Sequence, residues 1–496
     1  MDIIRNFPAV SILLCLFAGI ISSALKEKVA RRLNTVLILV VTALSAATLF
    51  YVLQTGEAFV YVMGKFPAPW GNEIRAGVLE ALMALFFCII MLLSLFGGRK
   101  KLIGEVEEGK RFLYYVLTNL LLSSLLALIY TNDLFTAYVF VEINTIAACG
   151  LIMIRQNGRT IEAAARYMIM SLLGSGLLLL GICMLYDITG HLLMSNIKEE
   201  VLILAQTGQY EIPLLVTIAL ISVGLAIKSA LFPFHTWLPD AYGYSTVSSA
   251  AMLSSLVSKG YLFLLIKIIY RVIGFEIYHD SQIINILFIF GLMGMIFGSL
   301  SAIKENDIRR MISFSSVAQI GYIYMGIGLG TEVAMAAAVF HMLSHGATKS
   351  MLFIGAIGLT DVSNGSRKFI DLTGAGYRHK IAGLAFTAGS LSMVGIPLFS
   401  GFISKLLFAQ AAVINQGKMM PALIVLAIST ILNAIYFMKT VIRIYTPVEE
   451  KGESITFKQE KLYGVTCICF IVLNVVLGVM SQPIVDWIQM GLGMFA

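Results

Sequence analysis

Long apolar stretches recur along the whole chain and are separated by short polar connectors. Each stretch has about 20 residues, the length that a helix needs to cross the hydrocarbon core of a bilayer. We find fourteen, at approximately 8–25, 35–54, 76–97, 112–130, 132–154, 165–187, 212–233, 247–270, 282–303, 311–330, 333–358, 381–411, 420–438 and 462–488. The pattern predicts an all-α integral membrane protein with fourteen transmembrane helices.

Composition agrees with a membrane protein and excludes a large soluble domain. Of the 496 residues, 58% are hydrophobic and only 13% are charged, whereas soluble domains carry about 25% charged residues. The longest connectors, near 54–75, 188–211 and 359–380, have about 20 residues each, too few to fold alone. The first apolar stretch has no small-residue cleavage pattern, so we expect it to be retained as a span.

The distribution of positive charge predicts the orientation in the membrane. Most of the 35 lysines and arginines lie in the connectors that follow odd-numbered stretches. Positive residues concentrate on the cytoplasmic side of a membrane. We therefore predict a multi-pass protein of the cell (inner, cytoplasmic) membrane with both termini outside. The net charge of +7 reflects this topology and indicates no nucleic-acid partner.

Five charged residues lie inside apolar stretches. They are Glu142, Lys228, Lys259, Lys349 and Lys405. A charge at the bilayer centre costs roughly 2.5–3.5 kcal/mol on insertion scales, and such residues commonly mark ion or proton pathways. Their number favours a translocator of protons or other ions over chance placement.

Two of the apolar stretches are interrupted by helix-breaking residues. The breaks contain Pro233 and Pro239 in one stretch and Gly395, Pro397 and Gly401 in the other. Proline removes a backbone donor and clashes with the preceding turn. Broken helices at membrane depth line protein-enclosed or water-filled sites and point to ion sites in transporters. Lys228 and Lys405 each lie within two turns of a break, while a plain proline kink is the simpler alternative.

A ladder of titratable side chains is predicted on one helix. His341, His345 and Lys349 are spaced by four residues, which places them on one helix face. The lysine argues against a metal site, because an ammonium repels a cation. Histidine changes charge near neutral pH, so this spacing fits proton transfer. The alternative is that the histidines form hydrogen bonds to neighbouring helices.

No pattern in the chain suits a cofactor. The six cysteines form no C-x-x-C pair, and all fall in apolar stretches. No glycine-rich nucleotide loop or iron–sulfur spacing is present. We expect neither metal nor redox cofactor in this chain, so that any redox chemistry would belong to other subunits.

Five motifs together resemble a known family. They are Asp133–Glu142, Lys228–Asp240 with its PFHTWLPD core, Asp307–Ser316, His341–Phe353 and Gly395–Lys405. The chain resembles the antiporter-like subunits shared by Mrp-type sodium/proton antiporters, the membrane arm of respiratory complex I and membrane-bound hydrogenases. The string from Asp133 to Glu142 is most similar to the Mrp D-type and hydrogenase branch. Departures are Tyr244-Ser-Thr246 after the WLPDA string and Leu398 in place of a second proline.

The resemblance implies a fold of two inverted five-helix repeats, each containing one broken helix. The implied divisions are an N-terminal three-helix segment at 1–111, a first repeat at 112–270, a second repeat at 282–438 and a C-terminal connector with the last helix at 439–496.

The resemblance also implies a proton path. Glu142 would pair with Lys228, Lys259 would follow on the next helix, His345 and Lys349 would bridge the halves, and Lys405 would end the path. His235 and His341 would support it. The implied partners are other membrane subunits of an antiporter, hydrogenase or complex I-like assembly, with protons, or sodium exchanged for protons, as the ions. Two alternatives remain, a non-conducting structural subunit of such a complex and a stand-alone cation or solute carrier.

Overall fold

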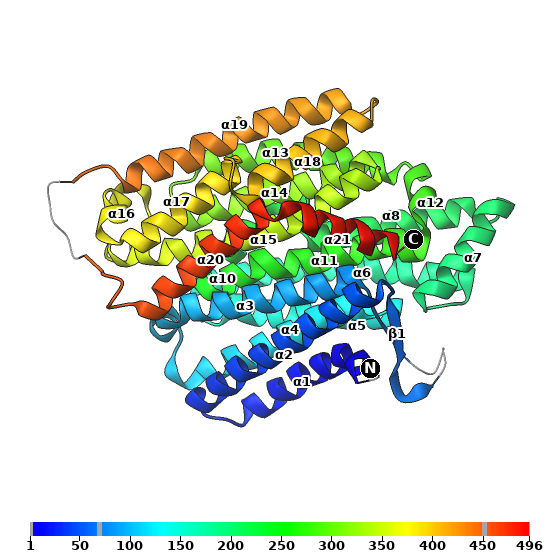
Figure 1. The fold of residues 1–496 in the computed structure, drawn as a ribbon, viewed down its shortest axis with the longest axis horizontal. Coiled ribbons are helices and arrows are strands. Elements are labelled where there is room, and N and C mark those ends of the chain that lie inside the picture. Colours follow the sequence, from blue (N-terminus) through cyan, green and yellow to red (C-terminus); the bar gives the residue numbers. More distant parts are fainter. Residues whose placement is uncertain (1–2, 67–71, 449–453, 496) are drawn as a thin grey trace.

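Helices make up nearly all regular structure in the computed structural model, which describes residues 3–66, 72–448 and 454–495 (Figure 1). The helices of the first half are α1 (Phe7–Ser23), α2 (Glu27–Thr55), α3 (Val78–Glu105), α4 (Arg111–Tyr130), α5 (Leu134–Met153), α6 (Gly158–Thr189), α7 (Met194–Thr207), α8 (Glu211–Lys228), α9 (Leu238–Tyr244), α10 (Val247–Met252) and α11 (Ser258–Ile268). The second half contains α12 (Phe275–Asp280), α13 (Ile283–Lys304), α14 (Ile308–Leu329), α15 (Glu332–Asp361), α16 (Ala375–Arg378), α17 (Lys380–Val394), α18 (Ser400–Ile414), α19 (Met419–Ile444), α20 (Lys461–Val479) and α21 (Ser481–Gly493).

Twelve helical segments in the described ranges are long and apolar enough to cross a membrane. They correspond to twelve of the predicted stretches. The stretch predicted at 333–358 is the 30-residue helix α15, and the stretch predicted at 381–411 is divided into α17 and α18. The mostly helical membrane protein expected from the sequence is confirmed at this level.

The C-terminal stretch departs from the prediction of one helix over 462–488. The helix α20 ends at Val479, Met480 leaves helical geometry (φ −94°, ψ 34°), and α21 begins at Ser481. Pro483 lies in the first turn of α21, where its missing N–H costs nothing. The pattern of apolar residues does not reveal this bend, because both helical segments are hydrophobic. After the bend, α21 continues onward from the end of α20 and contacts α15 and α3 (Figure 1).

Two connectors contain structure that the hydropathy pattern does not predict. Strands β1 (Phe59–Val62) and β2 (Glu73–Ala76) pair antiparallel, with Phe59 opposite Ala76 and Val62 opposite Glu73. The connector after α6 folds into α7, an amphipathic helix. The described structure therefore contains one short β-hairpin in addition to the predicted helices.

The most buried helices lie in the middle of the bundle. Every residue of α15 from Ala334 to Thr360 is buried, and the segments 247–273 and 308–329 are almost completely enclosed. Figure 1 shows α10, α11, α14 and α15 between the N-terminal helices on one side and α19 on the other. By contrast, α1, α2, α6, α13 and α19 leave much of their apolar surface exposed. The charged residues of α11 and α15 therefore lie in the core.

Candidate functional site: a row of buried charged and polar groups

The first broken helix ends at Lys228. After the last residue of α8, Ala230 adopts a left-handed conformation (φ 63°), and a short 3-10 helix over Phe234–Trp237 precedes α9. A helix C-terminus carries partial negative charge from its unpaired carbonyl groups, which favours a cation there. Lys228 is therefore the last helical residue before the break inside the bundle.

Lys228 is held by three side chains from two neighbouring helices. Its Nζ donates to Thr145 Oγ1 at 2.8 Å and to Ser171 Oγ at 3.0 Å, and lies 3.7 Å from Glu142 Oε1. The Lys228 side chain is fully buried, whereas that of Glu142 is 26% exposed. Glu142 also accepts a hydrogen bond from Ser175. The ion pair implied by the family resemblance is thus present as a contact at the edge of the bundle.

Small residues on α6 let this cluster form. Ser171 and Ser175 present hydroxyls to Lys228 and Glu142, and Gly174 lies between them in sequence. A Cβ atom on Gly174 would come within 2.8 Å of Gly224 O and 3.0 Å of Lys228 Cγ. The close approach of α6 to α8, and the position of the lysine stem, therefore depend on glycine.

Lys259 lies just after an irregular turn in its helix. Residues Leu253–Val257 form a π-helical turn between α10 and α11. Such turns loosen the regular backbone hydrogen bonding of a helix, and Lys259 Nζ donates to Ser254 O in this turn and, at 3.3 Å, to Ser258 Oγ. Within the described residues, no carboxylate pairs with this fully buried lysine. The positive charge is stabilised by carbonyl and hydroxyl oxygens alone.

The three titratable residues of α15 face two different neighbours. The rings of His341 and His345 stack with centroids 5.9 Å apart and planes 7° apart. His341 Nδ1 contacts Ser404 Oγ at 2.5 Å, while both ring nitrogens of His345 have no hydrogen-bond partner among the described residues. Lys349 instead donates to Ile312 O at 2.9 Å and to Ser315, both on α14. Buried polar atoms of native proteins usually have a protein or water partner, so His345 is a candidate water contact.

Lys405 lies beside the second break. It follows that break in the chain, whereas Lys228 precedes the first one. The helix α17 ends at Val394, Gly395 adopts φ 92°, and α18 begins at Ser400. Lys405 Nζ reaches back to the preceding helix and donates to Val394 O at 2.7 Å and Met393 O at 3.1 Å. Lys405 thus binds carbonyl groups at the C-terminus of α17, whereas the ammonium of Lys228, the last residue of α8, binds hydroxyl groups on α5 and α6.

Tyr322 and Ser404 connect Lys405 to the histidines. The Tyr322 ring stacks on His341 with centroids 5.4 Å apart, and Lys405 Nζ lies 5.9 Å from the centre of the same ring. Ser404 precedes Lys405 and contacts His341. Between the π-helical turn and α15, Ser255 Oγ and Ser350 Oγ are 2.8 Å apart. Tyr322 and Ser404 therefore connect Lys405 with His341, and the Ser255–Ser350 contact separately joins the π-helical turn to α15.

His235 does not join this row. Its ring stacks on Phe232 with centroids 5.3 Å apart, and its Nδ1 has no hydrogen-bond partner in the described part of the chain. The break residues Pro233 and Pro239 bracket it. Near the second break, a Cβ on Gly401 would come within 1.8 Å of Ser392 O, so the close contact of α18 with α17 requires glycine at 401.

A second buried charge cluster was not singled out from the sequence. Arg75 Nη1 lies 2.7 Å from Glu80 Oε1, and Arg75 also donates to Met494 O. Lys267, fully buried, donates to Ile129 O at 2.6 Å and to Thr131 O. Because Arg75 and Lys267 stand near the ends of apolar stretches, their positions suggest interfacial residues. Arg75 is placed inside the protein by strand β2 and by its contact with the end of α21, whereas Lys267 is held by the end of α4 and by Thr131.

The amphipathic helix α7 brings a further cation near this cluster. Burial, and to a lesser extent the nearby Arg271, lower the pKa of Lys198, which lies outside the membrane-spanning segments.

As for metals, no group of three or more His, Cys, Asp or Glu side chains in the described ranges is arranged to hold an ion.

The comparisons with known proteins agree on one family. Residues 131–432 match the family described as "NADH:quinone oxidoreductase/Mrp antiporter, TM". NADH-quinone oxidoreductase subunit N of Desulforudis audaxviator is 33% identical over 412 residues, which are 82% of this chain and 79% of that protein. The D-type subunit of the Na(+)/H(+) antiporter of Alkalihalophilus pseudofirmus is 28% identical over 431 residues, 86% and 84% of the two chains.

Two solved structures share the fold over the full length. A chain of the membrane-bound sulfane sulfur reductase, an archaeal respiratory membrane complex, aligns with a TM-score of 0.90 and 25% identity over 100% of this chain and 98% of that one. A chain of the Mrp complex from Dietzia sp. DQ12-45-1b aligns with a TM-score of 0.87 and 24% identity, covering 99% and 97%. The second likeness concerns the fold alone.

Proposed function

This chain belongs to the NADH:quinone oxidoreductase/Mrp antiporter family, and from that premise we propose that it is a proton-translocating subunit of a multisubunit membrane complex. The observation that carries the proposal is the row of groups that runs from the partly exposed Glu142 through the buried Lys228, Lys259 and His345 to the partly buried Lys405. Charged groups are expensive in a bilayer interior, and this row crosses the core of the bundle from one broken helix to the other.

The path begins at the ion pair. Attraction to Glu142 favours the protonated form of Lys228, and weakening of that pair releases the proton toward Lys259. Coulomb interactions are strong in a medium of low dielectric constant. Lys259 lies on α11, which together with the preceding π-helical turn contacts α15, the helix of His341, His345 and Lys349. A change of charge at Lys259 therefore alters the cost of a proton on the next groups.

The path continues through His345 to Lys405. The unpartnered nitrogens of His345 are placed to exchange hydrogen bonds with water, and the contacts of His341 with Tyr322 and Ser404 lead on to Lys405. Serine and threonine hydroxyls both donate and accept hydrogen bonds, so they suit a relay. Lys349, which is bound to α14, acts electrostatically on the protonation of the groups in the middle of the row. The coupled ion is the proton, with sodium exchange as the second possibility for the complex.

The proposed architecture has fourteen spans, which include two inverted repeats of five helices each. The helix α15 and the pair α17–α18 complete the set of twelve long apolar helices. The breaks after α8 and after α17 occupy corresponding places in the two repeats, at 112–270 and 282–438. The concentration of lysine and arginine in the odd connectors supports both termini facing out.

The exposed face of α5 supports a neighbouring subunit. Glu142 lies on the same helical stripe as Phe135, Val139 and Ile146, which are 47%, 39% and 62% exposed. A carboxylate on a surface facing lipid is unfavourable. A second membrane subunit packed against this stripe would cover Glu142. It would also allow that subunit to act on the ion pair at which the path begins.

Replacement of Lys259 by methionine tests the path against a matched control on the same helix. Both Lys259 and Lys267 are fully buried and donate to backbone carbonyls. Lys259→Met should lower proton translocation at least about tenfold, which corresponds to ~1.4 kcal/mol in the transfer step. Lys267→Met should translocate protons as the parent complex does, after correction for the amount assembled. Acidification of proteoliposomes holding the whole complex measures both.

Equal losses of translocation in the two variants would show that the effect comes from removing any buried lysine, and would overturn the assignment of Lys259. Full translocation by the Lys259→Met complex would contradict the proposed function itself.

A further inference from the structure

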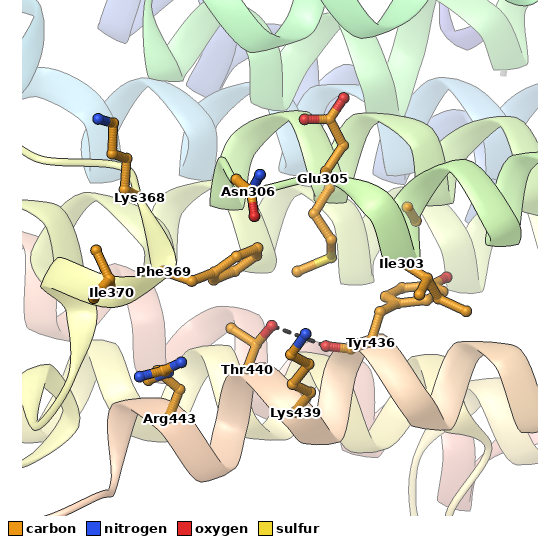
Figure 2. Close-up of a pocket in the computed structure, with 12 residues that line it drawn as sticks. Ile303, Glu305, Asn306, Lys368, Phe369, Ile370, Tyr436, Lys439, Thr440 and Arg443 are labelled. Atoms are coloured by element: carbon orange, nitrogen blue, oxygen red, sulfur yellow. Dashed lines mark hydrogen bonds between the residues drawn. The ribbon is translucent and has the colours of Figure 1, made fainter.

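A pocket opens between the inner ends of α13 and α19. It has a volume of about 490 Å³. Figure 2 shows Tyr436, Lys439, Thr440 and Arg443 on α19 at one side, and residues that follow the end of α13 at the other. The segment with Phe369 closes a third side. The pocket lies among the basic odd connectors, and it is separate from the row of groups that includes Lys405.

Three basic side chains line this pocket without a protein partner. Within the described residues, the side chains of Lys368, Lys439 and Arg443 form no hydrogen bond and no ion pair. The single acidic lining residue, Glu305, is engaged by Arg310 at 3.1 Å. The lining therefore has an unneutralised positive charge that suits an anion.

Of the remaining lining residues, five are apolar and three, Asn306, Tyr436 and Thr440, are polar. The apolar lining residues are Ala302, Ile303, Met311, Phe369 and Ile370. A soluble anion gains nothing from such surface, whereas an amphiphile uses both the cations and the apolar wall. A volume of several hundred Å³ is typical of small-molecule sites and fits a lipid headgroup with the first carbons of its chains.

The apolar wall continues along surfaces that face the lipid. Phe297 and Leu300 on α13 and Ile431, Ile435 and Ile442 on α19 are all exposed. These two helices contact each other, so their exposed apolar surfaces lie close together. Acyl chains leaving the pocket would therefore meet apolar side chains from both helices.

We propose that this pocket binds an anionic phospholipid. Lys368, Lys439 and Arg443 surround the phosphate, and the acyl chains lie against α13 and α19. Anionic lipids of the cytoplasmic leaflet attract basic segments at the membrane surface, and arginine and lysine are the side chains that bind phosphate groups. The orientation predicted from positive charge places the pocket at that leaflet.

A second inner pocket offers a contrast. It has a volume of about 590 Å³ and more cations in its lining, but most of these already have protein partners. Arg155 donates to Tyr244 O, Arg367 lies 3.2 Å from Asp307, and Lys101 binds Asp361. Occupied cations leave less charge for a ligand, so the pocket beside α19 is the stronger site.

The test uses the purified, delipidated complex and measures its affinity for phosphatidylglycerol by native mass spectrometry and by thermal stabilisation. The double variant Lys439→Gln/Arg443→Gln should bind on the order of thirtyfold more weakly, because each basic residue near anionic lipid contributes about one kcal/mol and 1.4 kcal/mol is tenfold. The control Lys304→Gln/Lys380→Gln removes two exposed cations outside the pocket and should bind as the parent does.

Further comparisons fix the chemistry of the ligand. Phosphatidylcholine should bind much more weakly than phosphatidylglycerol, and Lys439→Arg/Arg443→Lys should restore most of the affinity. The proposal is overturned if inorganic phosphate stabilises the parent complex as well as the lipid does, if the two double variants bind phosphatidylglycerol equally, or if cross-linking from Ile442→Cys captures a neighbouring subunit on this face in place of lipid.

Discussion

Glu142→Gln and Lys228→Ala should each stop proton movement in a complex that still assembles. The two residues form the only carboxylate–lysine pair among the five charged groups of the row, with 3.7 Å between Oε1 and Nζ. Removing one partner of a fully buried pair costs roughly 3–5 kcal/mol, because the remaining charge is left without compensation, and the 26% exposure of Glu142 places this pair below that range. A proton held by Lys228 would lose the carboxylate that stabilises it, so the first step of transfer fails.

The structure gives reasons to expect that these variants assemble. Lys228 keeps hydrogen bonds to Thr145 and Ser171 when Glu142 is replaced, and glutamine can still accept the hydrogen bond of Ser175. We expect transport to fall by at least about tenfold, the effect of ~1.4 kcal/mol in the rate-limiting step. Fluorescence of a pH-sensitive dye in proteoliposomes measures the transport, and gel filtration measures the assembly.

Glu162→Gln supplies the matched control for Glu142→Gln. It makes the same chemical change on the adjacent helix α6, where the side chain is 63% exposed and pairs with Arg166. Normal transport by both the Glu142→Gln and Lys228→Ala complexes would refute the ion pair as the start of the path.

Lys405→Ala should also abolish transport, whereas Lys405→Arg should keep part of it. The ammonium of Lys405 binds Val394 O and Met393 O at the end of α17, where helix carbonyls favour a cation. Arginine can reach the same carbonyls and preserves the positive charge, although it holds its proton much more firmly than lysine does. Alanine removes both the charge and the titratable group, so the expected loss is again at least about tenfold.

Lys418→Ala is the control for this position. Lys418 also donates to a backbone carbonyl, Gly328 O at 2.6 Å, but it lies in the loop after α18. Its replacement should leave the rate of proton uptake by proteoliposomes unchanged. If the alanine and arginine variants of Lys405 show equal and substantial activity, position 405 lies off the path.

The sequence located most of the span-forming segments and the charged residues within them, because both depend on local composition. Hydropathy over about 20 residues reports membrane depth, and a lysine such as Lys259 is conspicuous within an apolar stretch. The breaks near Pro233 and Gly395 were also readable, since proline and glycine act on the backbone next to them.

What the sequence could not predict depends on contacts between distant segments. The partners of Lys259 and Lys405 are backbone carbonyls made available by a π-helical turn and by the end of α17, and side-chain spacing carries no signal for either. The bend at Met480 and the Arg75–Glu80 cluster likewise depend on α21 packing against α3. The spacing of four residues places Lys349 on the same helix face as the histidines, yet its ammonium binds α14. The contacts of a long side chain depend on how the neighbouring helices pack around it.

The proposed transfer from one half of the protein to the other is tested most directly at His345. Both of its ring nitrogens lack a hydrogen-bond partner within the described residues, so His345→Leu breaks no hydrogen bond to the protein and keeps a buried apolar volume. If the charged row were only structural, this variant would assemble and function normally. Proton uptake by proteoliposomes containing the assembled His345→Leu complex should be nearly abolished if protons pass between Lys259 and Lys405. Uptake at the parental rate would contradict the path.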